Sequence, residues 1–397
     1  MRNACPPQGG GRLITRLKRV WERATGESAA RGLRFDRPLL LFQSDDWGRV
    51  GIRDRPGWER LRAAGLALGE KPYDFYSLET AADVQALGEL LKRHHDSVGR
   101  NPPFLMNFIM ANVDFDRALA SGGNEIPLLA LSDGLPRDWQ RPALFEAYGQ
   151  GVQDGIFFPA LHGLTHFCEK AMLRELAAEA ERAELIRKMW SAQTPYIHWR
   201  MPWIGYEYWD AELQPERRFL SLNEQRSAIH RAGEIYRKLF GGRPLSACAP
   251  GYRANADTRT AWAEEGVRVV QNGPGGSKAP YLDEHGMLHT FRTIEIEPAI
   301  HHCELQSVMR DVAGCFDSGL PAVISIHSIN FHSTIRDFRT QTLALLDDFL
   351  SAIEEKYPRV LYLHDGDLFQ IATEGSYRAH GATVAVGASN METKSRR

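Results

Sequence analysis

The sequence predicts an α/β fold in which a parallel sheet closes into a barrel. Short apolar runs, rich in β-branched and aromatic residues, alternate along the chain with longer segments of helical periodicity, a pattern typical of parallel sheets. Such units, repeated about seven or eight times, favour a barrel over an open sheet. The first strand leads into SDDWG, where an open sheet that binds a dinucleotide would show G-x-G-x-x-G.

Each predicted strand is a short apolar run bounded by polar or turn-forming residues. These runs are residues 38–44, 104–111, 155–161, 244–249, 267–271, 288–296, 322–327 and 359–364. Between them, apolar residues that recur every three or four positions predict helices at residues 80–95, 169–191, 222–240, 257–265, 304–318 and 337–356. Residues 196–210, YIHWRMPWIGYEYWD, are unusually aromatic and interrupt this alternation, so we expect an inserted loop there.

The two ends of the chain are predicted to lie outside the barrel, which should span residues 36–374. In residues 1–35, Leu13, Leu17 and Trp21 fall at helical spacing among basic residues, which predicts a basic amphipathic segment. Such a segment either packs on the domain or contacts an anionic membrane surface. Residues 375–397 are rich in Gly, Ala, Ser and charge, so we expect a poorly ordered tail.

The composition excludes several classes of function. Of the 397 residues, 43% are hydrophobic and 25% are charged, and the net charge is -2. This balance argues against a nucleic-acid-binding protein, which would carry a basic excess. The five cysteines are scattered without a CxxC pair, which argues against a disulfide framework and a zinc ribbon. No secretory leader is recognisable, so we expect the protein in the cytoplasm. Peripheral contact with the inner face of the membrane is a second expectation.

Polar residues stand where several predicted strands end. The first strand delivers Asp45 and Asp46, the third delivers His162 and His166, and the seventh delivers His327. In a (β/α) barrel the chemistry lies at the carboxyl ends of the strands. Two adjacent carboxylates after a buried strand repel each other unless a cation pairs with them or water surrounds them.

A bound metal ion would account for these residues. His162 and His166 are four residues apart, which places both imidazoles on one face if the chain turns helically. The spacing alone also fits solvated or core histidines. With Asp46, they form a set that leaves coordination positions open, as in catalytic sites. Asp45 would then serve as a general base; the alternative is a solvated turn in which an aspartate caps the next helix.

Four blocks in a fixed order carry a resemblance to a known family. They are SDDWG, HGLTH, CAPGY and SIH, each at a predicted strand end. Together they resemble the polysaccharide deacetylase superfamily, also called NodB-like or carbohydrate esterase family four, over roughly residues 38–370. The resemblance implies a distorted (β/α)7-type barrel with loop insertions. It assigns Asp45 as general base and His327 as general acid.

The resemblance also implies one divalent metal ion held by Asp46, His162 and His166. Zinc is the usual ion, and cobalt, nickel and iron accept the same ligands. A backbone N–H near Gly251 or Tyr252 would stabilise the oxyanion.

One block departs from the family pattern. Cys248 stands where the family usually has an Arg that orients the base, and Arg253, a few residues later, is the candidate to replace it. In the aromatic loop, Trp203 offers a flat face to a sugar ring, although core packing explains such residues equally well.

The expected function is metal-dependent removal of an N-acyl group, such as acetyl, from an amino sugar of a glycan or a glycan precursor. Without a leader for export, we expect a nucleotide-linked or lipid-linked sugar, or a surface polysaccharide under assembly. Two alternatives remain. Cys248 also suits a catalytically silent barrel that binds glycan or a biosynthetic partner. The same site would also suit a metal-dependent hydrolase of an O-ester or a formamide.

Overall fold

The apolar run that precedes the two aspartates forms β2 (Leu39–Trp47), a strand that is buried along its whole length. The computed structural model of the chain describes residues 32–122, 125–178, 180–274 and 278–390. Within these residues, β2 belongs to a sheet in the order β11–β12–β2–β3–β6–β7–β8–β10–β9, and β13 pairs separately with β2. The other strands of this sheet are β3 (Phe104–Phe108), β6 (Phe157–Leu161), β7 (Ser246–Cys248), β8 (Val269–Asn272), β9 (Tyr281–Leu282), β10 (Leu288–Phe291), β11 (Ile294–Glu295), β12 (Ala322–His327) and β13 (Leu361–Tyr362).

The sheet is strongly curled and almost entirely parallel. Only the pairing of β10 with β9 is antiparallel among the strand pairs that the structure describes in this sheet. β10 and β11 lie near opposite ends of the strand order, yet only Arg292 and Thr293 separate them in the chain. The Arg292 amide donates to Asn272 at 3.2 Å, and the Thr293 amide donates to Val323 at 3.0 Å. The two ends of the sheet therefore meet at this segment, and the predicted distorted barrel is confirmed.

The interior of the barrel changes from apolar to polar along β2. Side chains alternate between the two faces of a strand. Leu39 and Leu41 join one buried apolar cluster, whereas Leu40 and Phe42 join the larger one. Further along, Gln43 donates hydrogen bonds to Asp365 at 2.8 Å and to Thr290 at 3.1 Å. The polar end of the interior is the carboxyl end of the strand, where the site residues were expected.

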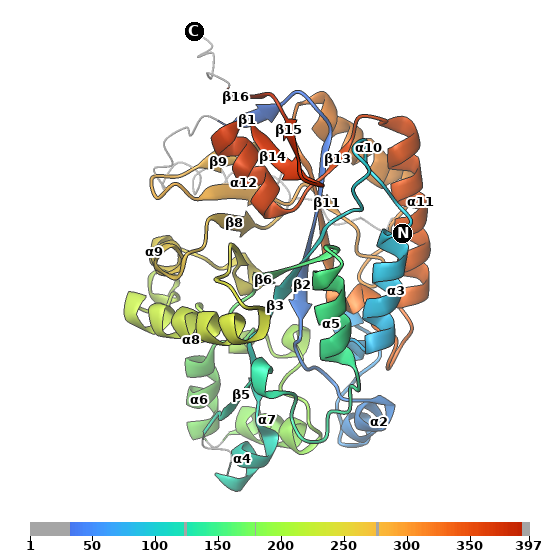
Figure 1. The fold of residues 1–397 in the computed structure, drawn as a ribbon. Coiled ribbons are helices and arrows are strands. Elements are labelled where there is room, and N and C mark those ends of the chain that lie inside the picture. The colour runs from blue at the N-terminus through green and yellow to red at the C-terminus, as the bar shows by residue number, and fades with distance from the viewer. Residues whose placement is uncertain (1–31, 123–124, 179, 275–277, 391–397) are drawn as a thin grey trace, which may run out of the picture.

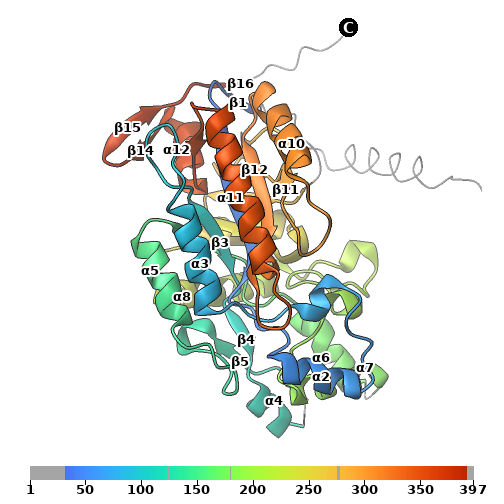
Figure 2. The same ribbon diagram turned by 90° about the vertical axis from the view of Figure 1, so that its right-hand side faces the viewer.

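Helices cover the outside of the sheet (Figures 1 and 2). They are α3 (Ala81–Leu91), α5 (Leu144–Gln153), α8 (Leu222–Phe240), α9 (Ala256–Glu265), α10 (Leu305–Asp317) and α11 (Arg339–Lys356). α12 (Asp365–Glu374) packs on the other face, because its Leu368 and Ile371 join the cluster that contains Leu39 and Leu41. The packing is aromatic in places: the ring of Phe42 lies 5.5 Å from Phe104 and 6.5 Å from Phe349 of α11. Local signals set the helix ends, as in α8, where Ser221 and Glu224 form a capping box and Gly241 ends the helix in a left-handed conformation.

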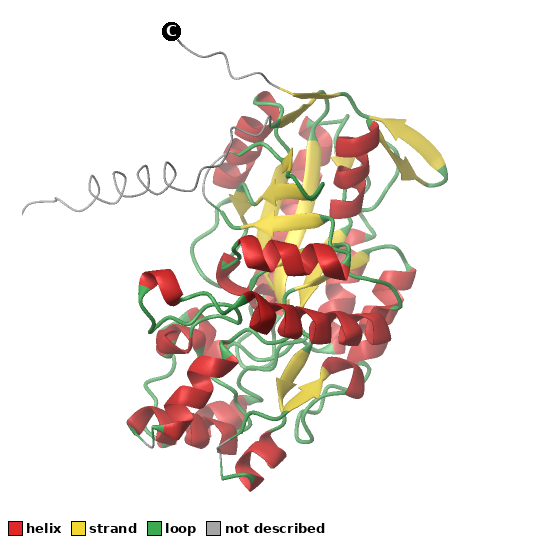
Figure 3. Cartoon of the chain, turned by 90° about the vertical axis from the view of Figure 1, so that its left-hand side faces the viewer, coloured by secondary structure: helices red, strands yellow, loops and turns green. Residues whose placement is uncertain are grey.

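A second group of helices lies beyond the carboxyl ends of the strands. In Figure 1 the arrowhead of β2 points toward the part of the molecule that holds α2, α4, α6 and α7, and Figure 3 shows that helices and loops dominate this part. These elements are α2 (Arg55–Ala63), α4 (Phe115–Ala120), α6 (Glu169–Ala177), α7 (Glu181–Ser191) and the hairpin of β4 (Ala111–Val113) and β5 (Leu128–Ala130). The single helix predicted over residues 169–191 is therefore wrong. Periodicity does not reveal the break, because it falls among alanines that suit either helix.

The end of the chain also differs from the prediction. Residues 376–390 are not a loose tail: β14 (Ser376–Ala379) pairs with β15 (Ala382–Ala385), and β16 (Ala388–Asn390) pairs with β1 (Leu33–Phe35). Tyr377 and Val386 join the buried cluster that contains Leu33 and Phe35, so tertiary packing overrides a loop-like composition. Residues 391–397 and the amphipathic segment predicted within residues 1–31 lie outside the described residues. In the described part of the chain, no helix combines the length and the apolar character needed to cross a bilayer.

Candidate active site

The two adjacent aspartates are both buried, and a bulge at the end of β2 directs them to different partners. β2 stays in register with β12 as far as the pair Asp45–His327, but its pairing with β3 shifts between Ser44 and Trp47. Asp46 takes a positive φ of 74°, a conformation that Asp adopts more readily than most residues. A bulge re-aims side chains that would otherwise alternate. The expectation of a solvated turn is therefore wrong.

Asp45 is held by a buried arginine that the sequence interpretation did not identify. Arg292 donates two hydrogen bonds to it, at 2.6 and 2.7 Å, and Asn107 donates a third at 2.7 Å. Burial, the largest single influence, would raise the pKa of Asp45. The charge and hydrogen bonds of Arg292, together with His162 and His327, outweigh burial and hold that pKa well below its usual range. Asp45 is thus an oriented carboxylate that stays ionised.

Asp46 lies against both histidines of the H-x-x-x-H block. Its Oδ1 is 3.3 Å from Nε2 of His166 and 3.7 Å from Nε2 of His162. All three side chains are buried, and one donor atom from each lies within 4.8 Å of the others. Arg49 approaches the same oxygen at 3.4 Å, so this carboxylate also has a cationic neighbour.

A loop rather than a helix brings the two histidines together. Gly163 has a φ of +105°, and a Cβ at this position would overlap the carboxylate of Glu207. Glu207 accepts hydrogen bonds from the amides of Leu164 at 2.7 Å and Thr165 at 3.3 Å, and burial raises the pKa of Glu207 to about 8. The helical turn assumed for this block is therefore wrong, although the predicted proximity of the imidazoles is correct.

Both imidazoles are fixed through their other nitrogen. Nδ1 of His162 donates to the carbonyl of Cys248 at 2.9 Å, and Nδ1 of His166 lies 2.7 Å from the hydroxyl of Tyr196. Burial lowers the pKa of both histidines, which keeps them neutral, as metal ligands must be. Hydrogen bonds of this kind orient ligating histidines in metalloproteins.

The residues fit a divalent metal ion. Oδ1 of Asp46 is buried and has no hydrogen-bond partner among the described residues, which is costly unless a cation or water satisfies it. Bonds of about 2.0–2.2 Å in a tetrahedral site place ligand atoms about 3.3–3.6 Å apart. The Asp46–histidine distances of 3.3 and 3.7 Å agree with this spacing. The buried Asp–His–His triad therefore has the donor set and the spacing of a metal site.

His327 lies on the far side of Asp45. Its Nε2 is 3.8 Å from Asp45, and its Nδ1 donates to Glu297 at 2.5 Å. Asn330 donates to the other oxygen of Glu297 at 2.6 Å. Burial lowers the pKa of His327, but Glu297 and the two aspartates outweigh burial and raise that pKa to about 9. At neutral pH the side chain is therefore a charged acid.

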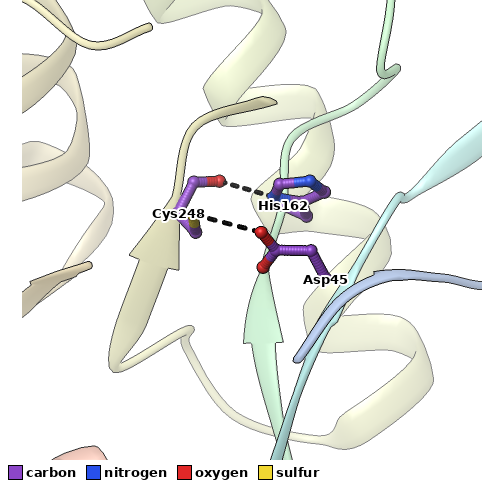
Figure 4. Close-up of side chains that lie close together, drawn as sticks. All are labelled: Asp45, His162 and Cys248. Carbon is purple, nitrogen blue, oxygen red and sulfur yellow. Dashed lines mark hydrogen bonds between the residues drawn. The ribbon is translucent and has the colours of Figure 1, made fainter. Parts of the chain in front are cut away.

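Cys248 lies beside both Asp45 and His162 (Figure 4). Its carbonyl accepts from His162, and its Sγ is 3.8 Å from Asp45 and 3.6 Å from Arg292. Asp45, His162 and Cys248 also lie close enough to form a second metal-ligand group. However, Arg292 already occupies both oxygens of Asp45, and burial raises the pKa of the Cys248 thiol. Cys248 is therefore a neutral side chain that packs in the core and not a metal ligand.

The remaining predicted residues lie around this centre. Arg253 is exposed and stacks over Trp209 at 4.8 Å, so it does not replace the arginine missing at Cys248. The Tyr252 amide donates to Ala249 at 2.8 Å and is therefore not free for an oxyanion. Gly251 packs against Tyr206, and Trp203 lines a pocket beside the site.

Known structures resemble the chain at low sequence identity. No protein-family model matches the chain, and no curated protein matches it. A proposed polysaccharide deacetylase from Mycobacterium smegmatis is 11% identical and has a TM-score of 0.44, with 87% of this chain and 92% of that chain covered. A proposed glycoside hydrolase/deacetylase from Parabacteroides distasonis is 13% identical and has a TM-score of 0.48, with coverages of 87% and 73%. A family 4 carbohydrate esterase from Streptomyces lividans is 12% identical and has a TM-score of 0.33, with coverages of 82% and 91%. Structures of carbohydrate esterase family 4 thus match most of the chain at low identity, as the order of the four blocks predicted.

Proposed function

We propose that this protein is a metal-dependent hydrolase that removes an N-acyl group, such as acetyl, from an amino sugar of a glycan or glycan precursor. The observation that supports this proposal is the placement of Asp45 and His327 beside the buried triad of Asp46, His162 and His166. A carboxylate that stays ionised and an imidazolium that faces it are the two groups that amide hydrolysis needs.

The triad would hold the metal ion, with zinc as the first candidate. Such an ion supplies a Lewis acid that polarises a carbonyl and makes water a better nucleophile near neutral pH. Asp45 accepts the proton of the attacking water. His327 donates its proton to the amine as the C–N bond breaks, because an unprotonated amine is a poor leaving group. The products are an amino sugar and a carboxylate.

The structure bears on both alternatives. The silent barrel was motivated by the missing arginine at Cys248, but Arg292 supplies a guanidinium that holds the same carboxylate. That motivation is therefore removed. Hydrolysis of an ester differs in its leaving group, because an alkoxide departs far more readily than the anion of an amine and therefore depends less on an acid.

We expect His327→Ala to lower turnover of an N-acetyl sugar by about 10²–10⁴-fold and turnover of a matched O-acetyl ester by much less. Acetate release from both substrates measures this difference. His302→Ala is the control, because His302 is an exposed histidine paired with Glu304. Equal losses on the two substrates would contradict the role of His327 in amide cleavage. A wild-type protein that binds glycans but releases no acetate would favour the silent barrel.

Glu297→Gln should change the pH dependence of the reaction. Glu297 and the nearby Asp45 and Asp46 raise the pKa of His327 to about 9, so the acid is present below this pH and is lost as the pH rises through it. Glutamine is neutral, so the substitution removes the largest contribution that raises the pKa of His327. The alkaline limb of kcat against pH should therefore move down by roughly one to two pH units. An unchanged limb would show that another group limits the rate.

A further inference from the structure

A pocket of about 490 Å³ opens beside the candidate metal site. Its lining includes His198, Trp203, Tyr206, Trp209, Arg218 and Arg253, most of them from the aromatic insertion. The His166 ring lies 5.7 Å from the ring of His198 and 5.8 Å from that of Tyr206. The pocket is therefore adjacent to the metal site, with these two rings lining the pocket and packing near His166.

The lining of the pocket holds three arginines, Arg182, Arg218 and Arg253, but only one carboxylate, that of Glu212. Arg253 lies 4.8 Å and Arg218 5.1 Å from the ring centroid of Trp209. Within the described parts of the chain, neither forms an ion pair with a carboxylate, and Arg218 donates only to the carbonyl of Leu213. Arg182, the third arginine of the lining, is instead paired with Glu212 at 3.2 Å.

Two guanidinium groups that lie against the same tryptophan ring repel each other, and a bound anion would offset that repulsion. Their planar donors match phosphate and carboxylate oxygens. The aromatic faces suit the apolar side of a sugar ring. We infer that the pocket binds an anionic group, a phosphate or a carboxylate, attached to the sugar whose N-acyl group lies at the metal site. The inference rests on the proposed function and narrows its substrate class to acidic amino-sugar conjugates.

Three N-acetylglucosamine substrates test the inference: a neutral methyl glycoside, the 1-phosphate, and a disaccharide whose second ring is a uronic acid. We expect kcat/KM for at least one anionic substrate to exceed that for the neutral one by about tenfold or more. Arg253→Gln and Arg218→Gln should each reduce this preference, the ratio of kcat/KM for the anionic substrate to that for the neutral one, by about tenfold. Arg226→Gln is the matched control, because Arg226 pairs with Glu264 on α8 and α9.

The acidic substrate that the enzyme prefers identifies the anionic group that the pocket binds. Preference for the 1-phosphate assigns a phosphate, and preference for the uronic acid assigns a carboxylate. Hydrolysis without any preference for charge would overturn the inference and leave the proposed function intact.

Calorimetry with the Asp45→Asn variant separates the two proposals, since it needs no turnover. One outcome would support the pocket and contradict the proposed function. In it, wild-type protein hydrolyses none of the substrates, anionic ligands bind selectively, and Arg253→Gln abolishes that selectivity. Equal affinity for neutral and anionic ligands, or no binding of any, would overturn the inference.

Discussion

Arg292→Ala is expected to lower the free energy of unfolding by about 3–5 kcal/mol, because it leaves Asp45 as a buried carboxylate without its partner. Arg292 is fully buried and donates to both oxygens of Asp45. Without Arg292, burial is opposed less strongly and the pKa of Asp45 rises, so the proposed base keeps its proton to a higher pH. Turnover should therefore fall, in addition to the free energy of unfolding. Urea denaturation and acetate release measure the two effects.

A double-mutant cycle separates the pair from its surroundings. Asp45→Asn alone leaves the charge of Arg292 unpaired, whereas the double variant removes both charges. The loss in the free energy of unfolding of the double variant should be smaller than the sum of the two single losses by about 2 kcal/mol or more. Arg226→Ala, which breaks the exposed pair with Glu264, should cost less than about 1 kcal/mol. Additive losses in the cycle would contradict a direct Arg292–Asp45 pair.

Arg292 also shows where sequence interpretation failed. Residues 288–296 were predicted as one strand, but the chain leaves β10 at Phe291 and begins β11 at Ile294. The arginine stands at this crossing and meets an aspartate 247 residues earlier in the chain. Local periodicity carries no information on which ends of a sheet meet. The available signal was the charged Arg292 within a run, LHTFRTIEI, that was predicted to be a strand, and Glu297 follows the same run.

The features that were predicted correctly are those with local causes. Each of the eight predicted strand runs contains a strand, because buried parallel strands are encoded as continuous apolar segments. Parallel strands also align their carboxyl ends, so residues far apart in sequence, such as Asp46 and His162, were expected to meet. The bulge at Asp46 and the Gly163 loop were not predicted, since both depend on contacts with distant residues such as Glu207.

Asp46→Asn should abolish metal binding while the backbone of the bulge persists, at some cost in stability because the buried Arg49 loses its facing carboxylate. Asn tolerates a positive φ as well as Asp does and has nearly the same shape, so the bulge can persist. The variant loses the anionic ligand between two neutral imidazoles, and Arg49 at 3.4 Å adds positive charge that an amide cannot offset. We expect turnover to fall by about 10³-fold or more, the equivalent of several kcal/mol of transition-state stabilisation.

Zinc-dependent stability gives a second measurement that does not depend on turnover. A ligand that binds only the folded state stabilises it by about 2.7 kcal/mol at one hundred times its dissociation constant. Wild-type protein and the control His230→Gln, an exposed histidine on α8, should show this gain and one zinc ion per chain. Asp46→Asn should show neither at the same zinc concentration. If the wild-type protein does not respond to zinc, cobalt, nickel or iron, or if Asp46→Asn responds equally, the triad is not a metal site. The charge of Arg49 would then explain how the buried Asp46 is balanced.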